Sequence, residues 1–268
     1  MSEYKLTQIN IYPVKSLAGI SLSESIVEER GLKYDRRWML VDNEDLFITQ
    51  RLVPKMIFIE VKIEYETLIF SHNRKNIEPL KLSINKLPEK IIKVQVWDDN
   101  CTAYEYNSEI NNWFSEALNF NCKLVYMPEV SERKTSIKYY PESKNVSFAD
   151  GYPYLIIGEE SLNFLNVKLE NPVEMERFRP NFVFSGGTAH DEDKWKDITI
   201  GNEKFTVVKP CARCVITTID PVSGNKSKEP LATLNTYRNF NNKVMFGQNV
   251  ICHSNGIVKV GDSINLLQ

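Results

Sequence analysis

The sequence has no long apolar run, no excess of either charge and few cysteines, and each absence excludes a class of protein. No stretch approaches the roughly 20 apolar residues of a membrane-spanning helix, and the amino terminus lacks a signal-peptide pattern. Lysine and arginine number 33 against 35 acidic residues, which does not favour a nucleic-acid-binding protein. Five cysteines are too few, and odd in number, for a secreted disulfide framework. We therefore expect a cytoplasmic protein with neither a membrane nor a nucleic acid as partner.

Several widespread functional motifs are also missing. The chain contains no GxxxxGK[ST], no GxGxxG and no GxSxG, so phosphate-binding loops and the hydrolase nucleophile elbow have no support. The hydrophobic and charged fractions, 42% and 25%, are those of an average globular protein. At about 150 residues per domain, the length predicts one large domain or two modest ones. The polar segment 126–144, with two prolines and no clear period, is the best candidate for a linker or mobile loop.

Alternation of apolar and polar residues predicts a chain dominated by β-strands, in the α+β class. The period-two alternation is clearest over residues 57–63 and 92–96. Further β-rich runs predict strands over residues 9–14, 20–27, 38–41, 181–184, 205–208, 215–219 and 257–266. A meander of this length usually closes into a barrel or a sandwich, because closure removes exposed sheet edges.

Three helices are expected among these strands. Apolar residues with helical spacing over residues 110–118 follow Asn107 and Ser108, either of which is a favourable cap. A second helix is expected over residues 159–169, where leucines form the apolar stripe behind an acidic first turn. A third is expected over residues 230–237, with proline in its first turn.

The strongest local signal is the pair Cys211-Ala-Arg-Cys214. A thioredoxin-type pair lies at a helix N-terminus, but Cys214 is followed by Val-Ile-Thr-Thr-Ile, which favours a strand. A structural zinc site needs four ligands, and Cys252 with His253 are neighbours that point to opposite faces of a strand. Two small buried cysteines are another interpretation. The fourth is a thiolate, favoured by Arg213, that binds a soft metal held mainly by a cofactor.

Basic residues of the amino-terminal half suggest an anion site. Lys15 and Ser16 follow one predicted strand and Arg36 precedes another. Together they offer a point charge, a hydroxyl donor and a planar fork, which suit a phosphate. Ordinary solvated charge at strand ends is the alternative. A third polar cluster, residues 177–181, runs into a strand, and its alternative is a surface turn.

An ordered set of motifs over nearly the whole chain resembles the MOSC proteins that carry an amino-terminal MOSC β-barrel domain. That group includes the mitochondrial amidoxime-reducing component and bacterial proteins that detoxify N-hydroxylated bases. The matching stretches are Tyr12-Pro-Val-Lys-Ser16, Gly31-Leu through Asp35-Arg36 to Trp38, Phe148-Ala-Asp-Gly-Tyr-Pro153, Phe178-Arg-Pro-Asn181 through Ser185-Gly186, Cys211-Ala-Arg-Cys214 through Asp220-Pro221, Glu229-Pro-Leu231 and Phe246-Gly-Gln248. The resemblance implies an amino-terminal β-barrel-like domain over residues 1–120 and a MOSC β-barrel domain with a few helices over residues 121–268.

The same resemblance implies a molybdenum–pterin cofactor with one protein thiolate on the metal. The matching metal ligand, and the residue expected to be catalytic, is Cys214, whereas Cys211 is near the site but not expected to bind the metal. The other residues carried over are the phosphate-binding Lys15, Ser16 and Arg36, the pterin contacts Arg179, Asn181 and Arg213, and the pocket-lining loop Asp150-Gly151-Tyr152 with Asn249.

The activity that the resemblance implies is reduction of the N–O bond of N-hydroxylated small molecules. Neither a membrane anchor nor a carboxy-terminal ferredoxin domain is visible, so the electrons are expected from a separate flavin or iron–sulfur protein. A non-catalytic carrier of the cofactor or of sulfur is the first alternative. A zinc-stabilised β-domain that uses Cys211, Cys214 and Cys252 is the second.

Overall fold

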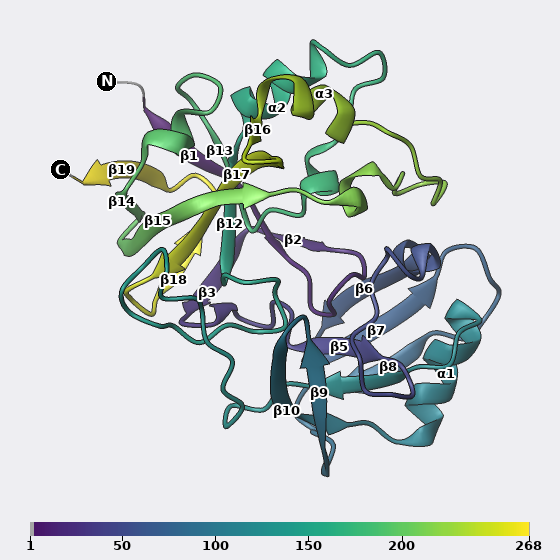
Figure 1. Cartoon of the computed structure of the whole chain (residues 1–268). Helices are drawn as coiled ribbons and strands as arrows, with labels where there is room; N and C mark the ends of the chain where they lie inside the picture. The colour runs from purple at the N-terminus through teal and green to yellow at the C-terminus, as the bar shows by residue number, and fades with distance from the viewer. Residues whose placement is uncertain (1–2, 268) are drawn as a thin grey trace.

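The computed structural model describes residues 3–267, so Met1, Ser2 and Gln268, on which the expectations about the chain ends partly rest, lie outside the described residues (Figure 1). The helices within this range are α1 (Ser108–Leu118), α2 (Glu159–Asn166), α3 (Leu231–Tyr237) and the short 3-10 turns η1 (Pro54–Phe58), η2 (Met175–Phe178), η3 (Asp191–Lys194) and η4 (Val215–Thr218). The strands are β1 (Tyr4–Ile11), β2 (Ile20–Leu22), β3 (Glu24–Glu28), β4 (Gly31–Leu32), β5 (Trp38–Val41), β6 (Ile59–Glu64), β7 (Thr67–His72), β8 (Leu80–Ser83), β9 (Lys90–Val96), β10 (Asp99–Glu105), β11 (Lys123–Tyr126), β12 (Tyr154–Gly158), β13 (Phe182–Ser185), β14 (Asp197–Ile200), β15 (Glu203–Ala212), β16 (Asn239–Phe240), β17 (Lys243–Cys252), β18 (Ile257–Lys259) and β19 (Ser263–Leu267).

A closed barrel forms the carboxy-terminal part of the molecule. Its strands follow the order β12, β13, β1, β19, β14, β15 and β17, and β17 returns to pair with β12. Inside, the ring of Tyr154 stacks on Phe182 at 5.5 Å, and Phe205 meets both edge-on. These rings remove much apolar surface from water, which is the main favourable contribution to folding. The predicted mainly-β fold with a barrel and a few helices is confirmed.

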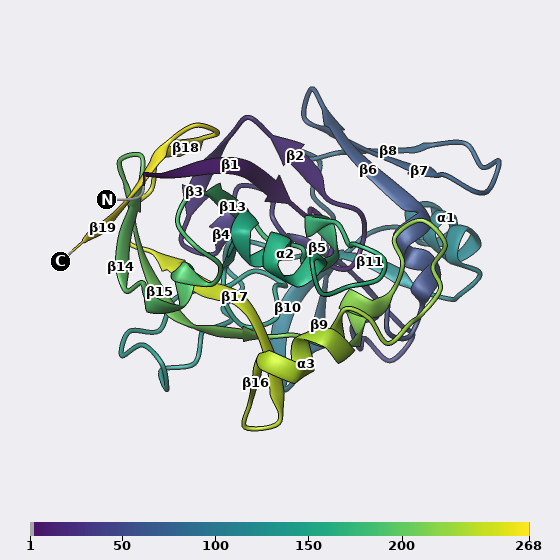
Figure 2. The ribbon, with the colours of Figure 1, turned by 90° about the horizontal axis from the view of Figure 1, so that it is seen from above.

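Strands β3 and β4 of the amino-terminal half form a small sheet with β18, and this half contributes most of two further sheets beside the barrel (Figures 1 and 2). One has the order β5-β11-β10-β9 and the other β6-β7-β8. Helix α1 packs on β11 and begins as expected, because the Asn107 side chain accepts a hydrogen bond from the amide of Ile110. Its apolar face adds Phe114 to a core that includes Trp38 and Phe70.

The first strand of the chain belongs to the barrel and not to these small sheets. Strand β1 lies between β13 and β19, and β3 pairs with β18 near the carboxyl end. The predicted division between residues 120 and 121 falls between α1 and β11, which pairs with β5 and β10. That division stays a prediction.

The strand expected over residues 215–219 is wrong, because this segment forms the 3-10 turn η4. The Thr217 hydroxyl donates to the carbonyl of Cys214 at 2.9 Å, and Thr218 donates to that of Val215 at 2.8 Å. These side-chain bonds give the backbone an alternative to a sheet, and they override the strand preference of β-branched residues. The expectation that Cys214 precedes a strand therefore fails. It sits instead at the N-cap of a four-residue turn, too short for a thioredoxin-like helix dipole.

Other predicted boundaries shift by a few residues. The run 57–63 begins with η1, the run 20–27 breaks at Ser23 between β2 and β3, and 257–266 breaks between β18 and β19. Helix α2 ends at Asn166, before the last leucine of its predicted stripe. The connection 126–144, expected to be a linker or mobile loop, contains the buried Arg133, which donates to the carbonyl of Ser147. Within residues 3–267, no helix is long and apolar enough to cross a membrane.

Candidate functional site

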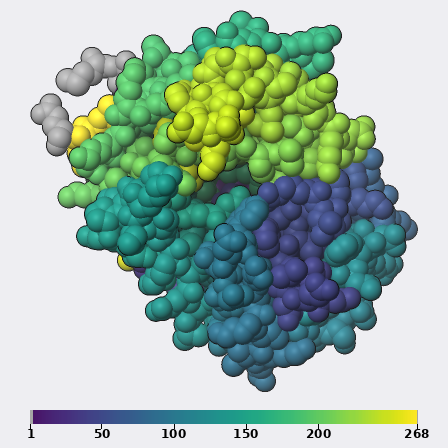
Figure 3. All heavy atoms as spheres, in the orientation of Figure 1, coloured from purple at the N-terminus to yellow at the C-terminus, as the bar shows by residue number. Residues whose placement is uncertain are grey.

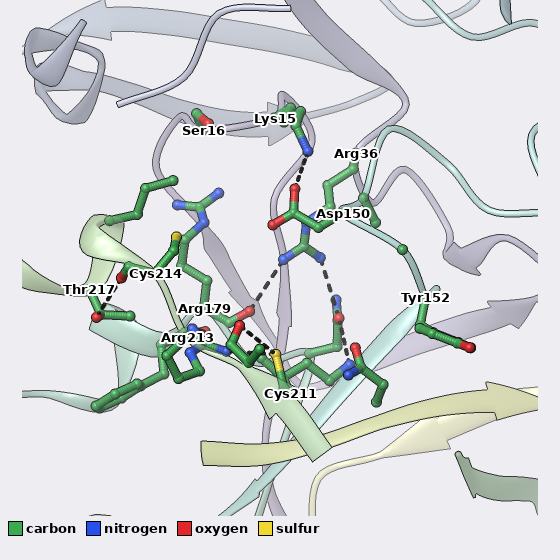
Figure 4. A pocket seen from close by; sticks show the side chains of 18 of the residues that line it. Lys15, Ser16, Arg36, Asp150, Tyr152, Arg179, Cys211, Arg213, Cys214 and Thr217 are labelled. Atoms are coloured by element: carbon green, nitrogen blue, oxygen red, sulfur yellow. Dashed lines mark hydrogen bonds and ion pairs between the residues drawn. The ribbon is translucent and has the colours of Figure 1, made fainter. Parts of the chain in front are cut away.

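A pocket lies between the barrel and the amino-terminal sheets, and every site residue expected from the sequence lines it. Figure 3 shows a hollow on this face where purple–blue and yellow-green atoms meet, and Figure 4 shows the side chains. The lining includes Lys15, Ser16, Arg36, Gly151, Tyr152, Arg179, Asn181, Arg213, Cys214 and Asn249. These residues come from loops and strand ends that are far apart in the sequence. The fold therefore assembles them, although their predicted roles stay predictions.

Lys15 is held inside the pocket wall by the loop that follows β1. Its ammonium group donates to the carbonyl of Phe148 at 2.8 Å and to Oδ1 of Asp150 at 2.5 Å. Burial lowers the pKa of Lys15 to about 8, with the charge of Asp150 acting in the opposite direction. Ser16, the next residue, has a φ of 69°. At neutral pH the lysine is thus a nearly desolvated cation with one N–H not used by these two contacts.

Arg36 is fixed by a fully buried carboxylate. Its Nη1 lies 2.5 Å from Oδ2 of Asp35 and donates to Oδ1 of Asn181 at 3.3 Å, while Nη2 donates to the Arg179 carbonyl at 3.2 Å. Although burial opposes the charge, Asp35 raises the pKa of Arg36. Asp35 also accepts from the Tyr12 amide at 2.7 Å. The guanidinium is therefore locked in place as a permanent charge.

The ring of Tyr12 packs against two guanidinium groups. The Arg36 Cζ lies 4.6 Å and the Arg179 Cζ 4.1 Å from the ring centroid. Burial lowers the pKa of Arg179 to about 10, so the residue stays charged at neutral pH. Ser16, Arg36 and Arg179 adopt φ angles of 69°, 52° and 54°, a region that costs a non-glycine residue about 1–2 kcal/mol. Strain of this kind persists where the surroundings over-determine the conformation, and it clusters at functional sites.

The cysteine pair lies at the end of β15, with both thiols free and partly exposed. Arg213 Nη1 lies 3.1 Å from the Cys211 sulfur, and its Nη2 donates to the Phe178 carbonyl at 2.6 Å. The Cys214 carbonyl accepts from both the amide and the hydroxyl of Thr217, which fixes the start of η4. Arg213 thus contacts the Cys211 sulfur, whereas Cys214 presents its sulfur to the pocket with no hydrogen-bond partner among residues 3–267.

The remaining lining residues differ in how far the protein itself uses them. An added Cβ at Gly151 meets no atom within 4 Å, so this stretch of wall is open. Tyr152 donates to the carbonyl of Ser136, and Asn249 donates weakly to the carbonyl of Lys209 at 3.3 Å. The Asn181 amide is nearly completely buried and bonded to neighbouring backbone and to Arg36. Asn181 therefore stabilises the pocket wall through these buried hydrogen bonds.

Two family models match the chain, the MOSC N-terminal beta barrel domain over residues 3–121 and the MOSC domain over residues 143–265. Mitochondrial amidoxime-reducing component 1 of Mus musculus is 32% identical over 98% of this chain and 82% of its own length. The chain belongs to the MOSC-domain family. The human amidoxime-reducing component 1 is 30% identical, with coverages of 98% and 82%.

A second kind of relative in the MOSC family is longer than this chain. Molybdenum cofactor sulfurase of Oryza sativa is 34% identical over 92% of this chain, but the chain spans only 32% of that protein's length. Among solved structures, the YUAD protein of Bacillus subtilis aligns over 98% of this chain and 94% of its own, at 11% identity and a TM-score of 0.45.

Of the other residues considered from the sequence, Cys211 lines this pocket, whereas Arg37, Arg177 and Cys252 do not. Arg37 donates to the carbonyl of Met127. Arg177, which belongs to η2, pairs with Asp220 at 2.8 Å. Cys252 sits in the barrel core, with its sulfur 3.3 Å from the Glu28 carbonyl. Cys211 packs against a different cluster, so the residues of the zinc alternative do not come together. Within residues 3–267, no three His, Cys, Asp or Glu side chains form a metal-binding group.

The sequence interpretation missed several groups that shape the pocket. Asp35 stands inside a quoted motif without an assigned role, and Asp150 is expected only as part of a loop that lines the pocket. The spacing along the sequence does not show that these carboxylates contact Arg36 and Lys15. Arg51 lines the pocket from the loop after β5, and Trp97 reaches Asp150 from the β9–β10 hairpin. No sequence signal marks them, because tertiary packing alone brings them there.

The donor set of the pocket fits an anionic cofactor that also presents a soft metal. The described lining carries the cations Lys15, Arg36, Arg51, Arg179 and Arg213 against the single carboxylate Asp150. Nη2 of Arg179 and Nε of Arg213 are buried without a hydrogen-bond partner among the described residues. Unsatisfied buried donors cost free energy unless a ligand engages them. The Cys214 thiol adds the ligand type that soft transition metals prefer.

Proposed function

We propose that this protein is a molybdenum-cofactor-dependent oxidoreductase that reduces N-hydroxylated compounds at the N–O bond. The observation that supports the proposal best is the convergence of a free thiol, Cys214, with five cations in one pocket. The names of the relatives, amidoxime-reducing components among them, supply the reaction class. The net reaction adds two electrons and two protons to N–OH and yields N–H and water. A separate flavin or iron–sulfur protein is the proposed electron donor.

In this proposal the chain's own residues bind and orient the cofactor. Lys15, Ser16 and Arg36 hold a phosphate. Lys15 donates its remaining N–H, and Arg36 donates from its fixed, planar guanidinium. Arg179 and Arg213 bring unpartnered donors to the pterin, and Gly151, Tyr152 and Asn249 line the approach. Cys214 gives its thiolate to the metal. When bound, the molybdenum–pterin group supplies the two-electron chemistry, which no side chain here can supply alone.

A non-catalytic carrier of the cofactor or of sulfur is the second candidate. It is supported by the molybdenum cofactor sulfurases among the relatives. Both candidates need Cys214, so binding does not separate them. Turnover of an amidoxime or hydroxylamine with a reduced viologen dye does: the oxidoreductase consumes dye in proportion to substrate, whereas a carrier shows no turnover.

The first test is metal and pterin analysis after expression in a host that makes the cofactor. We expect close to one molybdenum and one pterin per chain. Purified, folded protein that contains neither would contradict both the oxidoreductase and the carrier of cofactor.

Cys214→Ser tests the metal ligand. A hydroxyl is a poor ligand for a soft metal, so we expect a folded protein whose turnover falls by at least about a hundredfold. Cys211→Ser is the matched control, because its sulfur lies in the same pocket, and it should keep most of the activity. Full activity in Cys214→Ser would refute the assignment.

A further inference from the structure

A second cavity, of about 480 Å³, lies where β2 runs beside β6 (Figures 1 and 2). Its wall is built from β1, β2, β6 and the turns η1, η2 and η4. It is separate from the pocket that contains Cys214, but Arg179 and Ile216 line both. Small-molecule sites typically span roughly 300–1,000 Å³, so this cavity is large enough to hold a ligand of its own.

Three carboxylates line the second cavity without a basic partner. Glu60 belongs to β6, Glu174 directly precedes η2, and Glu176 belongs to η2. All three residues are exposed, and their side chains form no ion pair or hydrogen bond among residues 3–267. Two elements that are far apart in the sequence therefore bring unpaired negative charge to one cavity.

The two arginines of the same lining do not cancel this charge. Arg177 pairs with Asp220 at 2.8 Å, so its charge is already balanced. Arg179 packs its Cζ 4.1 Å from the centroid of the Tyr12 ring and donates to the Leu17 carbonyl at 2.8 Å. Three carboxylates thus stand against one guanidinium without an acidic partner. The second cavity is electronegative, whereas the pocket next to it is electropositive.

Two nearly buried amides bring unused hydrogen-bonding atoms to the second cavity. Gln50 is 6% exposed and donates to the Ser16 carbonyl at 2.7 Å, but no residue between 3 and 267 donates to its Oε1. Asn10 is 9% exposed and accepts from the Ser21 hydroxyl at 2.7 Å, but its Nδ2 donates to none of the described residues. Buried polar groups are normally hydrogen-bonded, so these two atoms point to a ligand.

The arrangement of the carboxylates favours an extended organic cation over a metal ion. Within residues 3–267, no three acidic, histidine or cysteine side chains come close enough to hold a metal. The apolar side chains of Ile57, Met175 and Ile219 line the same cavity. A chain of methylene groups that carries separate ammonium groups can pack on this apolar surface and still reach separate carboxylates.

We propose that the second cavity binds an aliphatic diamine or polyamine, with Glu60, Glu174 and Glu176 as partners of its ammonium groups. Gln50 accepts from an ammonium N–H at the buried end. One consequence of this site rests on the proposed function: an anionic cofactor in the neighbouring pocket neutralises Arg179 and so removes a like charge from the surroundings of the amine. By linkage, the amine then strengthens cofactor binding by the same factor.

Titration calorimetry with spermidine tests the site, and 1,5-diaminopentane with its neutral isostere 1,5-pentanediol tests the need for charge. Both amines should bind, and the diol should bind at least about tenfold more weakly than the diamine. Glu60→Gln and Glu176→Gln should each weaken spermidine binding about twofold to fivefold, the usual effect of an exposed ion pair. Glu64→Gln and Glu170→Gln are the matched controls, because they remove the same charge from exposed residues outside the cavity.

A charge added to the second cavity gives an independent test. Asn73 lines the cavity from an exposed turn, so Asn73→Lys places an ammonium group there and should weaken spermidine binding several-fold. Asn76→Lys is its control, since Asn76 is exposed nearby but does not line the cavity. Equal spermidine affinity in the Asn73→Lys and Asn76→Lys proteins would contradict the site.

The outcomes separate this inference from the proposed function. Absence of spermidine binding, equal binding of the diamine and the diol, or displacement of spermidine by an equal concentration of Mg²⁺ overturns the amine site, whether or not N-hydroxylated compounds are reduced. Glutamate-dependent spermidine binding in a chain that takes up no molybdenum supports the amine site and overturns the proposed function. If molybdenum is bound, spermidine affinity should fall several-fold on its removal, and an unchanged affinity overturns the coupling through Arg179.

Discussion

Single side chains at the pocket are fixed by partners that the solvent does not reach. The guanidinium of Arg36 touches the buried carboxylate of Asp35 on one side and the ring of Tyr12 on another. The ring of Tyr12 also contacts the guanidinium of Arg179, so one aromatic ring serves two cations. Each group is held by several contacts, and removal of one partner leaves a charge buried without compensation.

Asp35→Asn removes the charge that balances Arg36 while it keeps the shape of the side chain. Because Asp35 is fully buried, we expect the free energy of unfolding to fall by about 3–5 kcal/mol. Urea denaturation measures this loss. Glu24→Gln, which breaks the exposed pair with Lys259, should leave the unfolding midpoint unchanged. Equal stability of the Asp35→Asn and unaltered proteins would show that Arg36 is satisfied in another way.

Two glycines of this fold should respond to alanine in opposite ways. Gly151 has open space around its added Cβ and no left-handed φ, so Gly151→Ala should be neutral or stabilise by up to about 1 kcal/mol. Gly247 has a φ of 76°, and its added Cβ would lie 2.9 Å from the Ile156 carbonyl oxygen. Gly247→Ala should destabilise by more than about 1 kcal/mol. A loss of bound molybdenum in Gly151→Ala without a loss of stability would place the cofactor against this wall.

At the scale of elements, the sequence predicts best where periodicity and burial agree. The run 92–96 alternates and forms the end of β9, and α1 starts at the cap residue that its sequence offers. The segment after Cys214 defeats the same reasoning, because threonine hydroxyls bond to carbonyls three residues back and form a turn. Amino-acid composition does not show whether these side-chain hydrogen bonds or sheet hydrogen bonds form, because the outcome depends on how β15 ends.

Some residues of the candidate site can likewise be predicted from the sequence, and others cannot. Motif resemblance finds Lys15, Arg36, Arg179 and Cys214, because these residues lie in contiguous matching stretches. Arg51 and Trp97 stand outside those stretches, and they reach the pocket through loops whose course depends on the packing of both sheets. Spacing along the chain carries no information about such contacts.

The connection between β11 and β12 should depend on one arginine. Arg133 donates to the carbonyls of Ser147, Ala149 and Asp150 and pairs with Asp99 at 2.8 Å. Arg133→Met should leave these carbonyls unpaired and speed hydrogen–deuterium exchange over residues 128–150. Lys134→Met is the matched control, since Lys134 is exposed and adjacent. Similar exchange rates in the two variants would show that the loop is held by its apolar contacts.

At the scale of the whole molecule, acid should destabilise this protein before its carboxylates titrate. Burial lowers the pKa of all three histidines, and that of His190 falls to about 4. In the unfolded chain, His190 binds a proton once the pH falls below its ordinary pKa of 6.5. In the folded chain it stays neutral until the pH reaches about 4, its lowered pKa. The free energy of unfolding is therefore highest above pH 6.5, where His190 is neutral in both states, and it falls as the pH drops from 6.5 toward 4.

His190→Asn provides the check, because asparagine tolerates the φ of 66° at this position. The variant should be less stable at pH 7, since His190 packs against Phe164 and Phe246, but its unfolding midpoint in urea should change less between pH 6.5 and 4.5. An unaltered pH slope would mean that His190 does not contribute to acid sensitivity.

The neighbouring position of β1 and β19 in the barrel has a consequence for biosynthesis. Tyr4 pairs with Ile264, so β1 is synthesised long before its partner β19, and the barrel cannot close until β19 is made. The small sheets and α1 depend mainly on residues 38–126 and can form earlier, because their contacts are more local. Cys214 joins β15 to η4 at the barrel's end, and it therefore meets Lys15 and Arg36 in a finished pocket only after synthesis of the barrel strands. The cofactor of the proposed function would therefore enter only after translation.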